Sequence, residues 1–165
     1  MNPSLIIFSI IFFDQFSKYL IKTLFLQYQQ IDILGSFLRF TYVENKGIAF
    51  GIDTSNYHLL ITLITIFGIS ILIYYYNYNL KDPVVEKIPL CFIIGGAIGN
   101  AIDRVFVLIP SMGYGGVVDF IDIGINSYRW YIFNVADTAI TIGIILYFIL
   151  EYKYNQKLND SSGNI

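Results

Sequence analysis

The sequence contains few of the residues from which most hydrolytic sites are built. Cys91 is the only cysteine and His58 is the only histidine. A disulfide within the chain is therefore excluded, and a Cys/His metal site is strongly disfavoured. We assign neither residue a catalytic task, because Cys91 reads as a small packing residue and His58 as an interfacial one. Carboxylates are left as the main candidates for catalysis.

Charged residues are scarce as well. They make up only 13% of the 165 residues, whereas hydrophobic residues make up 56%. A soluble domain carries about 25% charged residues, so this chain is better suited to lipid than to water. Ten basic residues against twelve acidic ones give a formal charge of −2, which leaves no basic patch for nucleic acid.

Long apolar runs dominate what is present. We predict a single membrane domain over residues 1–153, with four transmembrane spans at roughly 4–21, 58–77, 88–107 and 133–152. The second run is uninterrupted and ends among tyrosines, which are typical of a membrane interface. Residues 154–165 are polar, and we predict a disordered tail there.

Two polar excursions between the spans predict β-structure. Residues 35–44 are aromatic and β-branched and favour a strand, and Asn45-Lys46-Gly47 favours a turn. Residues 48–51 favour a short returning strand, and residues 117–123 favour another strand after the glycine-rich loop at 110–116. The predicted fold class is therefore integral membrane and mainly α, with a small sheet resting at the membrane surface.

The first span carries two opposite charges. Asp14 and Lys18 are four residues apart and share one helical face, where they can neutralise each other. One interpretation is an interfacial pair in which Lys18 reaches the lipid headgroups. The other is a pair that faces a polar cavity within the bundle.

The third span has one small, polar face. Gly95 and Gly99 form a small-xxx-small pair that allows another helix to approach closely. Asn100 and Arg104 continue that face, with Asp103 beside them. We favour a site role for Asn100 and Arg104 over the alternative, an interfacial Asp103–Arg104 pair.

Two aspartates are the central candidates for catalysis. Asp137 lies inside the fourth span, where a carboxylate is costly and usually has a partner and a task. Asp119 lies upstream, across a loop short enough to bring it back to Asp137. We predict that they form one site, with Asn134 on the helical face of Asp137. Two close carboxyl groups share one proton, so one can activate water while the other polarises a carbonyl.

Five motifs between residues 14 and 137 resemble those of the lipoprotein signal peptidases, the bacterial signal peptidase II family of aspartyl membrane proteases. They are Asp14-Gln15-x-x-Lys18, Asn45-x-Gly47-x-Ala49-Phe50-Gly51, Gly95-Gly96-Ala97-x-Gly99-Asn100-x-x-Asp103-Arg104, Val117-Val118-Asp119-Phe120 and Phe133-Asn134-x-Ala136-Asp137. No single motif is specific, but the five in family order are. Ile48 departs from the pattern, because the family usually has a small residue there.

The resemblance implies an orientation and a set of site residues. It implies an extracytoplasmic β-cradle on four transmembrane helices of a bacterial inner (cytoplasmic) membrane protein. Both termini and the tail would be cytoplasmic, and the active site would lie near the extracytoplasmic face. Charge bias alone does not decide this, since five basic residues in the excursions stand against four in the termini and central loop. Asp119 and Asp137 would be the catalytic pair, without metal or cofactor. The residues implied to bind substrate or to support the aspartates are Asp14, Lys18, Asn45, Gly47, Asn100, Arg104 and Asn134.

The implied substrate is a prolipoprotein whose lipobox cysteine already carries diacylglycerol. Cleavage on the N-terminal side of that cysteine would release the signal peptide, and the enzyme would act in membrane lipid as a monomer. A proton- or ion-coupled transporter is a rival, but it predicts polar residues in every span and usually an internal repeat. No acidic or basic residue other than His58, at its start, lies in the second span, and no repeat is visible. A non-enzymatic assembly factor would explain the spans but not two aspartates flanking an aromatic loop.

Overall fold

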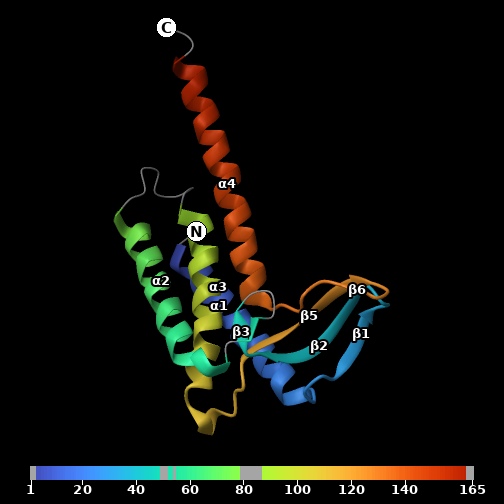
Figure 1. The fold of residues 1–165 in the computed structure, drawn as a ribbon. Helices are drawn as coiled ribbons and strands as arrows, with labels where there is room; N and C mark the ends of the chain where they lie inside the picture. Colours follow the sequence, from blue (N-terminus) through green and yellow to red (C-terminus); the bar gives the residue numbers. More distant parts are fainter. Residues whose placement is uncertain (1–2, 49–51, 54, 79–86, 163–165) are drawn as a thin grey trace.

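Four long helices make up most of the described chain. The computed structural model describes residues 3–48, 52–53, 55–78 and 87–162, and the helices within them are α1 (Pro3–Leu24), α2 (His58–Tyr78), α3 (Lys87–Val107) and α4 (Val135–Ser162). Each contains a stretch long and apolar enough to cross a membrane. The predicted four-helix membrane fold is therefore confirmed (Figure 1).

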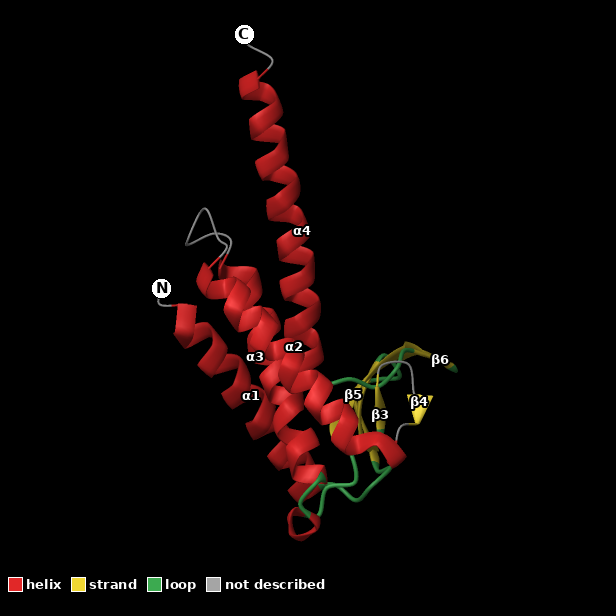
Figure 2. Cartoon of the chain, turned by 60° about the vertical axis from the view of Figure 1, so that its left-hand side comes forward, coloured by secondary structure: helices red, strands yellow, loops and turns green. Residues whose placement is uncertain are grey.

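The end of α4 differs from the sequence-based expectation. A disordered tail was predicted from residue 154, but α4 continues to Ser162 and extends beyond the other helices at the end away from the sheet (Figure 2). The prediction was wrong because polarity alone does not stop a helix. The segment has no proline or glycine before Gly163, and it contains glutamine, lysine and leucine, which favour helix.

Helix α3 packs against each of the other three helices, and its glycines set how close two of them come. A Cβ added to Gly95 would lie 3.0 Å from a side-chain carbon of α1, and one added to Gly99 would lie 2.6 Å from Asp14 Oδ2. A Cβ on Gly96 would overlap the carbonyl oxygen of Ala136 in α4. The predicted packing role of Gly95 and Gly99 is thus confirmed, and it brings polar groups of α1, α3 and α4 together.

A four-stranded antiparallel sheet lies beside one end of the helices (Figure 1). Its order is β1 (Gln30–Leu34), β2 (Leu38–Asn45), β5 (Val117–Ile125) and β6 (Tyr128–Arg129). The strands predicted at 35–44 and 117–123 are found as β2 and β5. Strand β2 begins at Leu38 because residues 35–37 form the turn from β1, with Gly35 at a φ of 51° that favours glycine. Strand β1 was not predicted.

Of the short strand predicted at 48–51, only Ile48 lies among the described residues, and it belongs to a strand. Strand β3 (Gly47–Ile48) pairs with β4 (Ile52–Asp53) and not with β2. The backbone N–H of Gly47 donates to Asn45 Oδ1 at 3.0 Å, so the asparagine side chain turns the chain as β2 ends. The motif residues 49–51 lie outside the described residues.

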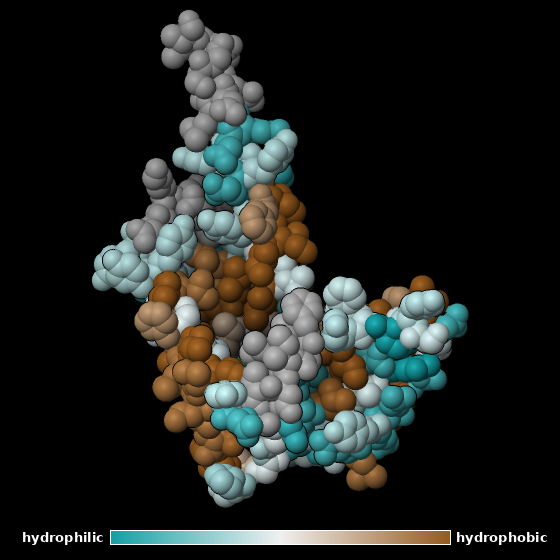
Figure 3. Space-filling model, in the orientation of Figure 1, coloured by the Kyte–Doolittle hydropathy of each residue, from teal (hydrophilic) through white to brown (hydrophobic). Residues whose placement is uncertain are grey.

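The sheet and the helices present different surfaces. One face of the sheet packs on the end of α1 through a cluster formed by Ile21, Tyr42, Val118 and Phe120. Figure 3 shows hydrophobic residues over the helices and mostly hydrophilic residues over the sheet. Phe67 of α2 is 67% exposed, as a lipid-facing side chain would be. The helical part is therefore suited to the bilayer and the sheet to its surface.

Candidate active site

Strand β5 places Asp119 at the boundary between sheet and helices. It pairs with Val43 of β2, and its side chain is only 2% exposed. The carboxylate accepts hydrogen bonds from Asn45 Nδ2 at 3.0 Å and from Asn134 Nδ2 at 2.6 Å. Both amides reach it from other elements, so the position of Asp119 depends on the junction between β2, β5 and α4.

The first turn of α4 positions Asp137 through a reciprocal cap. Asn134 immediately precedes the helix, and its Oδ1 accepts the backbone N–H of Asp137 at 2.9 Å. Asp137 Oδ2 in turn accepts the backbone N–H of Asn134 at 3.2 Å. This is the capping-box pattern, in which an N-cap side chain and an acidic residue three positions later satisfy each other's backbone. Asp137 Oδ1 accepts a further bond from Asn100 Nδ2 of α3 at 2.7 Å.

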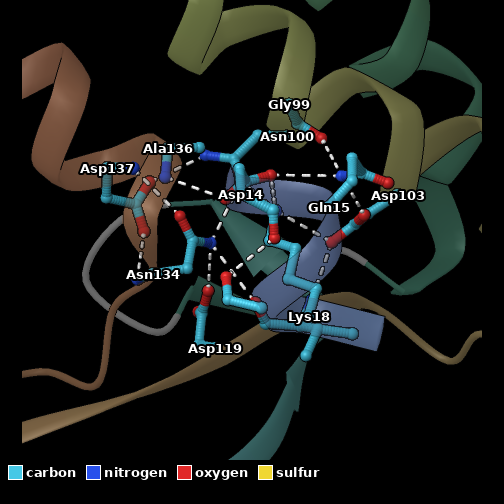
Figure 4. A network of polar contacts seen from close by, with 12 residues as sticks. Asp14, Gln15, Lys18, Gly99, Asn100, Asp103, Asp119, Asn134, Ala136 and Asp137 are labelled. Atoms are coloured by element: carbon cyan, nitrogen blue, oxygen red, sulfur yellow. Dashed lines mark hydrogen bonds and ion pairs between the residues drawn. The ribbon is translucent and has the colours of Figure 1, made fainter. Parts of the chain in front are cut away.

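Asn134 links the two aspartates directly. After β6 the backbone of Phe133 pairs with Ile121 of β5, which brings the start of α4 alongside Asp119. The fully buried side chain of Asn134 then bonds to the Asp119 carboxylate and caps the turn that carries Asp137 (Figure 4). The prediction that the short loop returns one aspartate to the other is confirmed in this geometry.

Both aspartates line one cavity of about 470 Å³. Its wall includes Asn100 and Arg104 from α3, together with apolar groups from α3 and α4. A second cavity of about 510 Å³, over the sheet, also reaches Asp119. Three further residues line both spaces: Asn45, Trp130 and Tyr131. The position of Trp130 and Tyr131 in the site was not predicted from the sequence.

The environment of Asp119 favours its protonated form. Burial, and then the charge of Asp137, raise the pKa of Asp119 to about 7. Hydrogen bonds from Asn45 and Asn134 and the charge of Lys18 act in the opposite direction but do not cancel the effect. A carboxyl group with this pKa can hold and release a proton near neutral pH, as a catalytic acid must.

A buried ion network lies behind the cavity. Lys18 Nζ is 2.9 Å from Asp14 Oδ2 and 3.1 Å from Asp103 Oδ2, and all three side chains are at most 1% exposed. The expected Asp14–Lys18 pair is confirmed. The interfacial interpretation of Lys18 is wrong, because the side chain points into the bundle. Asp103 forms its ion pair with Lys18 and not with Arg104, the alternative considered from the sequence. Gln15 Nε2 also donates to Asp103 Oδ1 at 3.1 Å.

The ion network also hydrogen-bonds to the backbone next to Asp119 and next to Asp137. Asp103 Oδ2 accepts the backbone N–H of Val118 at 3.0 Å, and Asp14 Oδ1 accepts that of Ala136 at 2.8 Å. These residues immediately precede Asp119 and Asp137. Lys18 Nζ also donates to Asn100 Oδ1 at 3.0 Å, which leaves the Asn100 amide directed at Asp137 (Figure 4).

The predicted site residues therefore form two groups. Asn45, Asn100 and Arg104 line the cavity with the aspartates, and Gly47 supports Asn45. Asp14, Lys18 and Asn134 are buried, so any effect they have on a substrate passes through their neighbours. Among the described residues, no three His, Cys, Asp or Glu side chains converge as a metal site would require.

Comparison with known proteins gives consistent matches over nearly the whole chain. A family model described as signal peptidase (SPase) II matches residues 6–153. The lipoprotein signal peptidase of Syntrophus aciditrophicus is 31% identical, covering 95% of this chain and 98% of the relative. That of Borreliella afzelii is 38% identical, covering 94% and 92%. A solved bacterial membrane enzyme, determined by the in meso method at 2.3 Å resolution, superposes with a TM-score of 0.82 at 33% identity, covering 94% of this chain and 90% of that one.

Proposed function

The chain belongs to the signal peptidase II family, and we propose that Asp119 and Asp137 are its catalytic pair. It is a protease for lipoprotein signal peptides and a multi-pass protein of bacterial membranes. One observation carries the assignment of the pair: both carboxyl groups line one cavity, and Asn134 hydrogen-bonds to both residues.

The two aspartates divide the work of hydrolysis. Asp119 holds the shared proton and hydrogen-bonds to the carbonyl oxygen of the scissile peptide, as its raised pKa favours. Asp137 takes a proton from a water molecule, whose oxygen attacks the carbonyl carbon. The C–N bond of the tetrahedral intermediate then breaks, and a proton passes from the pair to the leaving amine.

The remaining polar residues of the site either bind the substrate or position the two aspartates. Arg104 and Asn100 face the cavity and orient the substrate, and the Arg104 charge offsets negative charge on the intermediate. Asn45 keeps Asp119 in place with the help of Gly47. Lys18, Asp14 and Asn134 act as a rigid support, as a precise site requires.

The membrane supplies selectivity. We place the sheet and the pair near the extracytoplasmic surface, and both termini at the cytoplasmic end of the bundle. A diacylglyceryl group buries many CH₂ units at about 0.8 kcal/mol each, which holds the substrate in the same lipid layer as the enzyme. Cleavage on the N-terminal side of the lipidated cysteine would then occur where the cavity meets the sheet. One chain provides every residue of the proposed site, so a monomer suffices.

The proposal is tested with purified protein in lipid and a prolipoprotein substrate. We expect cleavage of the diacylglyceryl-modified form, with the lipidated cysteine as the new N-terminus by mass spectrometry. The same prolipoprotein without the lipid is the control, and it should remain intact. Equal cleavage of both forms would show that the diacylglyceryl group is not needed for substrate recognition. Passage of solute across the bilayer without any cleavage would favour the transporter.

The pH dependence of cleavage should report on Asp119. Because this group must carry a proton, kcat/KM is expected to fall as pH rises through about 7. The hydrogen bond from Asn45 favours the ionised carboxylate, so Asn45→Ala should raise the midpoint of that fall by about one pH unit. Rates measured from pH 5 to 9 check this. A midpoint that is unchanged or lower in Asn45→Ala would contradict the role given to Asp119.

A further inference from the structure

A second charged cluster lies on the opposite side of β2 from the cavity. Lys22, in the last turn of α1, points its Nζ at Glu44 Oε1 at 2.6 Å and at the carbonyl oxygen of Gly113 at 2.7 Å. The same ammonium lies 3.3 Å from Tyr42 Oη and 4.3 Å from the centre of the Tyr114 ring. One cation therefore contacts β2 and the loop between α3 and β5, in which Gly113 and Tyr114 lie.

Glu44 completes the cluster from β2. Its side chain is only 10% exposed, and Tyr42 Oη donates to its Oε1 at 2.8 Å. Its Oε2 accepts the backbone N–H of Gly115 at 2.9 Å. Burial by itself would raise the pKa of Glu44, but the bonds from Lys22, Tyr42 and Gly115 outweigh it and hold the pKa below its ordinary value. The carboxylate is therefore charged and fully engaged near neutral pH.

The cluster adjoins the residue that holds Asp119. Glu44 and Asn45 are consecutive in β2, so their side chains point to opposite faces of the strand. Glu44 faces the loop, while Asn45 donates to Asp119 at 3.0 Å. The loop also packs closely against the Asn45 backbone, because a Cβ added to Gly116 would lie only 2.5 Å from the carbonyl carbon and oxygen of Asn45.

We propose that Lys22 and Glu44 form a clamp that fixes the end of β2, so that Asn45 holds Asp119 in its reactive position. Both are positioning residues, because they act through Asn45 and contact neither the cavity nor Asp119. The proposal rests on the function proposed above. It assigns a task to charges that lie outside the five motifs.

The clamp should affect turnover more than binding. The ladder between β2 and β5 and the apolar cluster on α1 do not depend on the Glu44 charge, so we expect Glu44→Gln to fold. Loss of the Glu44 charge would instead loosen the hydrogen bond from Asn45 to Asp119, and Asp119 would then be held less precisely for reaction. We expect Glu44→Gln to lower kcat about tenfold with KM nearly unchanged, and Lys22→Met to do the same.

A double-mutant cycle with Asn45→Ala separates positioning from a general loss of stability. In the Asn45→Ala background, Glu44→Gln should lower kcat by less than about twofold, because the contact it supports is already gone. Asp32→Asn is the matched control, since Asp32 pairs with Arg39 on the same sheet at 2.8 Å but is 61% exposed. It should leave kcat and KM as in the wild type.

Tyr42→Phe provides a second, milder variant in case Glu44→Gln unfolds. It keeps the ring in the apolar cluster and removes one donor to Glu44, so a two- to threefold loss of kcat, again absent with Asn45→Ala, is expected. Equal losses of kcat in both backgrounds, or none in either, would overturn the clamp. Failure of the wild type to cleave the lipidated substrate would instead refute the proposed function.

Discussion

Asp137→Asn is expected to abolish cleavage, with kcat/KM reduced at least about 10⁴-fold, and Asp119→Asn should do the same. An amide at position 137 cannot take the proton of the attacking water. An amide at position 119 cannot pass a proton to the leaving amine. Because the two groups act as one unit, the double variant should be no slower than either single variant. Initial rates with a diacylglyceryl-modified prolipoprotein measure all three.

These variants should remain folded, which makes their kinetics interpretable. Burial makes ionisation of Asp119 unfavourable in the native state, so a neutral amide of the same shape removes no needed charge there at neutral pH. Its NH2 group replaces one of the two oxygens that accept bonds from Asn45 and Asn134, so the cost is limited to about one hydrogen bond. Asp32→Asn, at the exposed carboxylate of β1, should purify and cleave like the wild type. A folded Asp119→Asn or Asp137→Asn variant that retained a rate within about tenfold of the wild type would contradict the dyad.

The sequence predicted the parts of this molecule that depend on local pattern. The spans follow from apolar runs of the length a bilayer requires, and β2 and β5 follow from β-branched and aromatic residues. Asp119 and Asp137 were identified because a carboxylate at membrane depth is rare and two in reach of each other can share a proton. The capping box between Asn134 and Asp137 was present in the sequence but was not used to set the start of α4.

Contacts between distant segments could not be predicted in the same way. Asp103 was paired with its neighbour Arg104 as one alternative, but its partner is Lys18, which is brought across by the close approach of α1 at Gly95 and Gly99. Strand β1 was missed because each of its five residues is exposed, so no buried face marks it. Its polar and apolar residues alternate only briefly, over a length at which the pattern is ambiguous.

Replacement of Lys18 should be the most destabilising single change outside the catalytic pair. Lys18→Met keeps the length of the side chain but removes the only cation within 3.1 Å of Asp14 and Asp103 among the contacts of the described residues. Two fully buried carboxylates would then lack a counter-charge. Breaking a buried ion pair in this way costs about 3–5 kcal/mol in the free energy of unfolding. Equilibrium unfolding in detergent micelles measures the loss.

The chain itself offers the controls that identify charge as the cause. Lys87→Met removes a lysine from the start of α3 that lies 4.7 Å from the Tyr76 ring, and it should cost no more than about 1 kcal/mol. Adding Asp14→Asn and Asp103→Asn to Lys18→Met should restore about half of the lost stability, because no unpaired charge is then buried. Since the same network holds Val118 and Ala136 beside the two aspartates, cleavage should recover less than stability does. If the free energy of unfolding of Lys18→Met lay within about 1 kcal/mol of the wild-type value, the charges of Asp14 and Asp103 would have to be compensated by other groups.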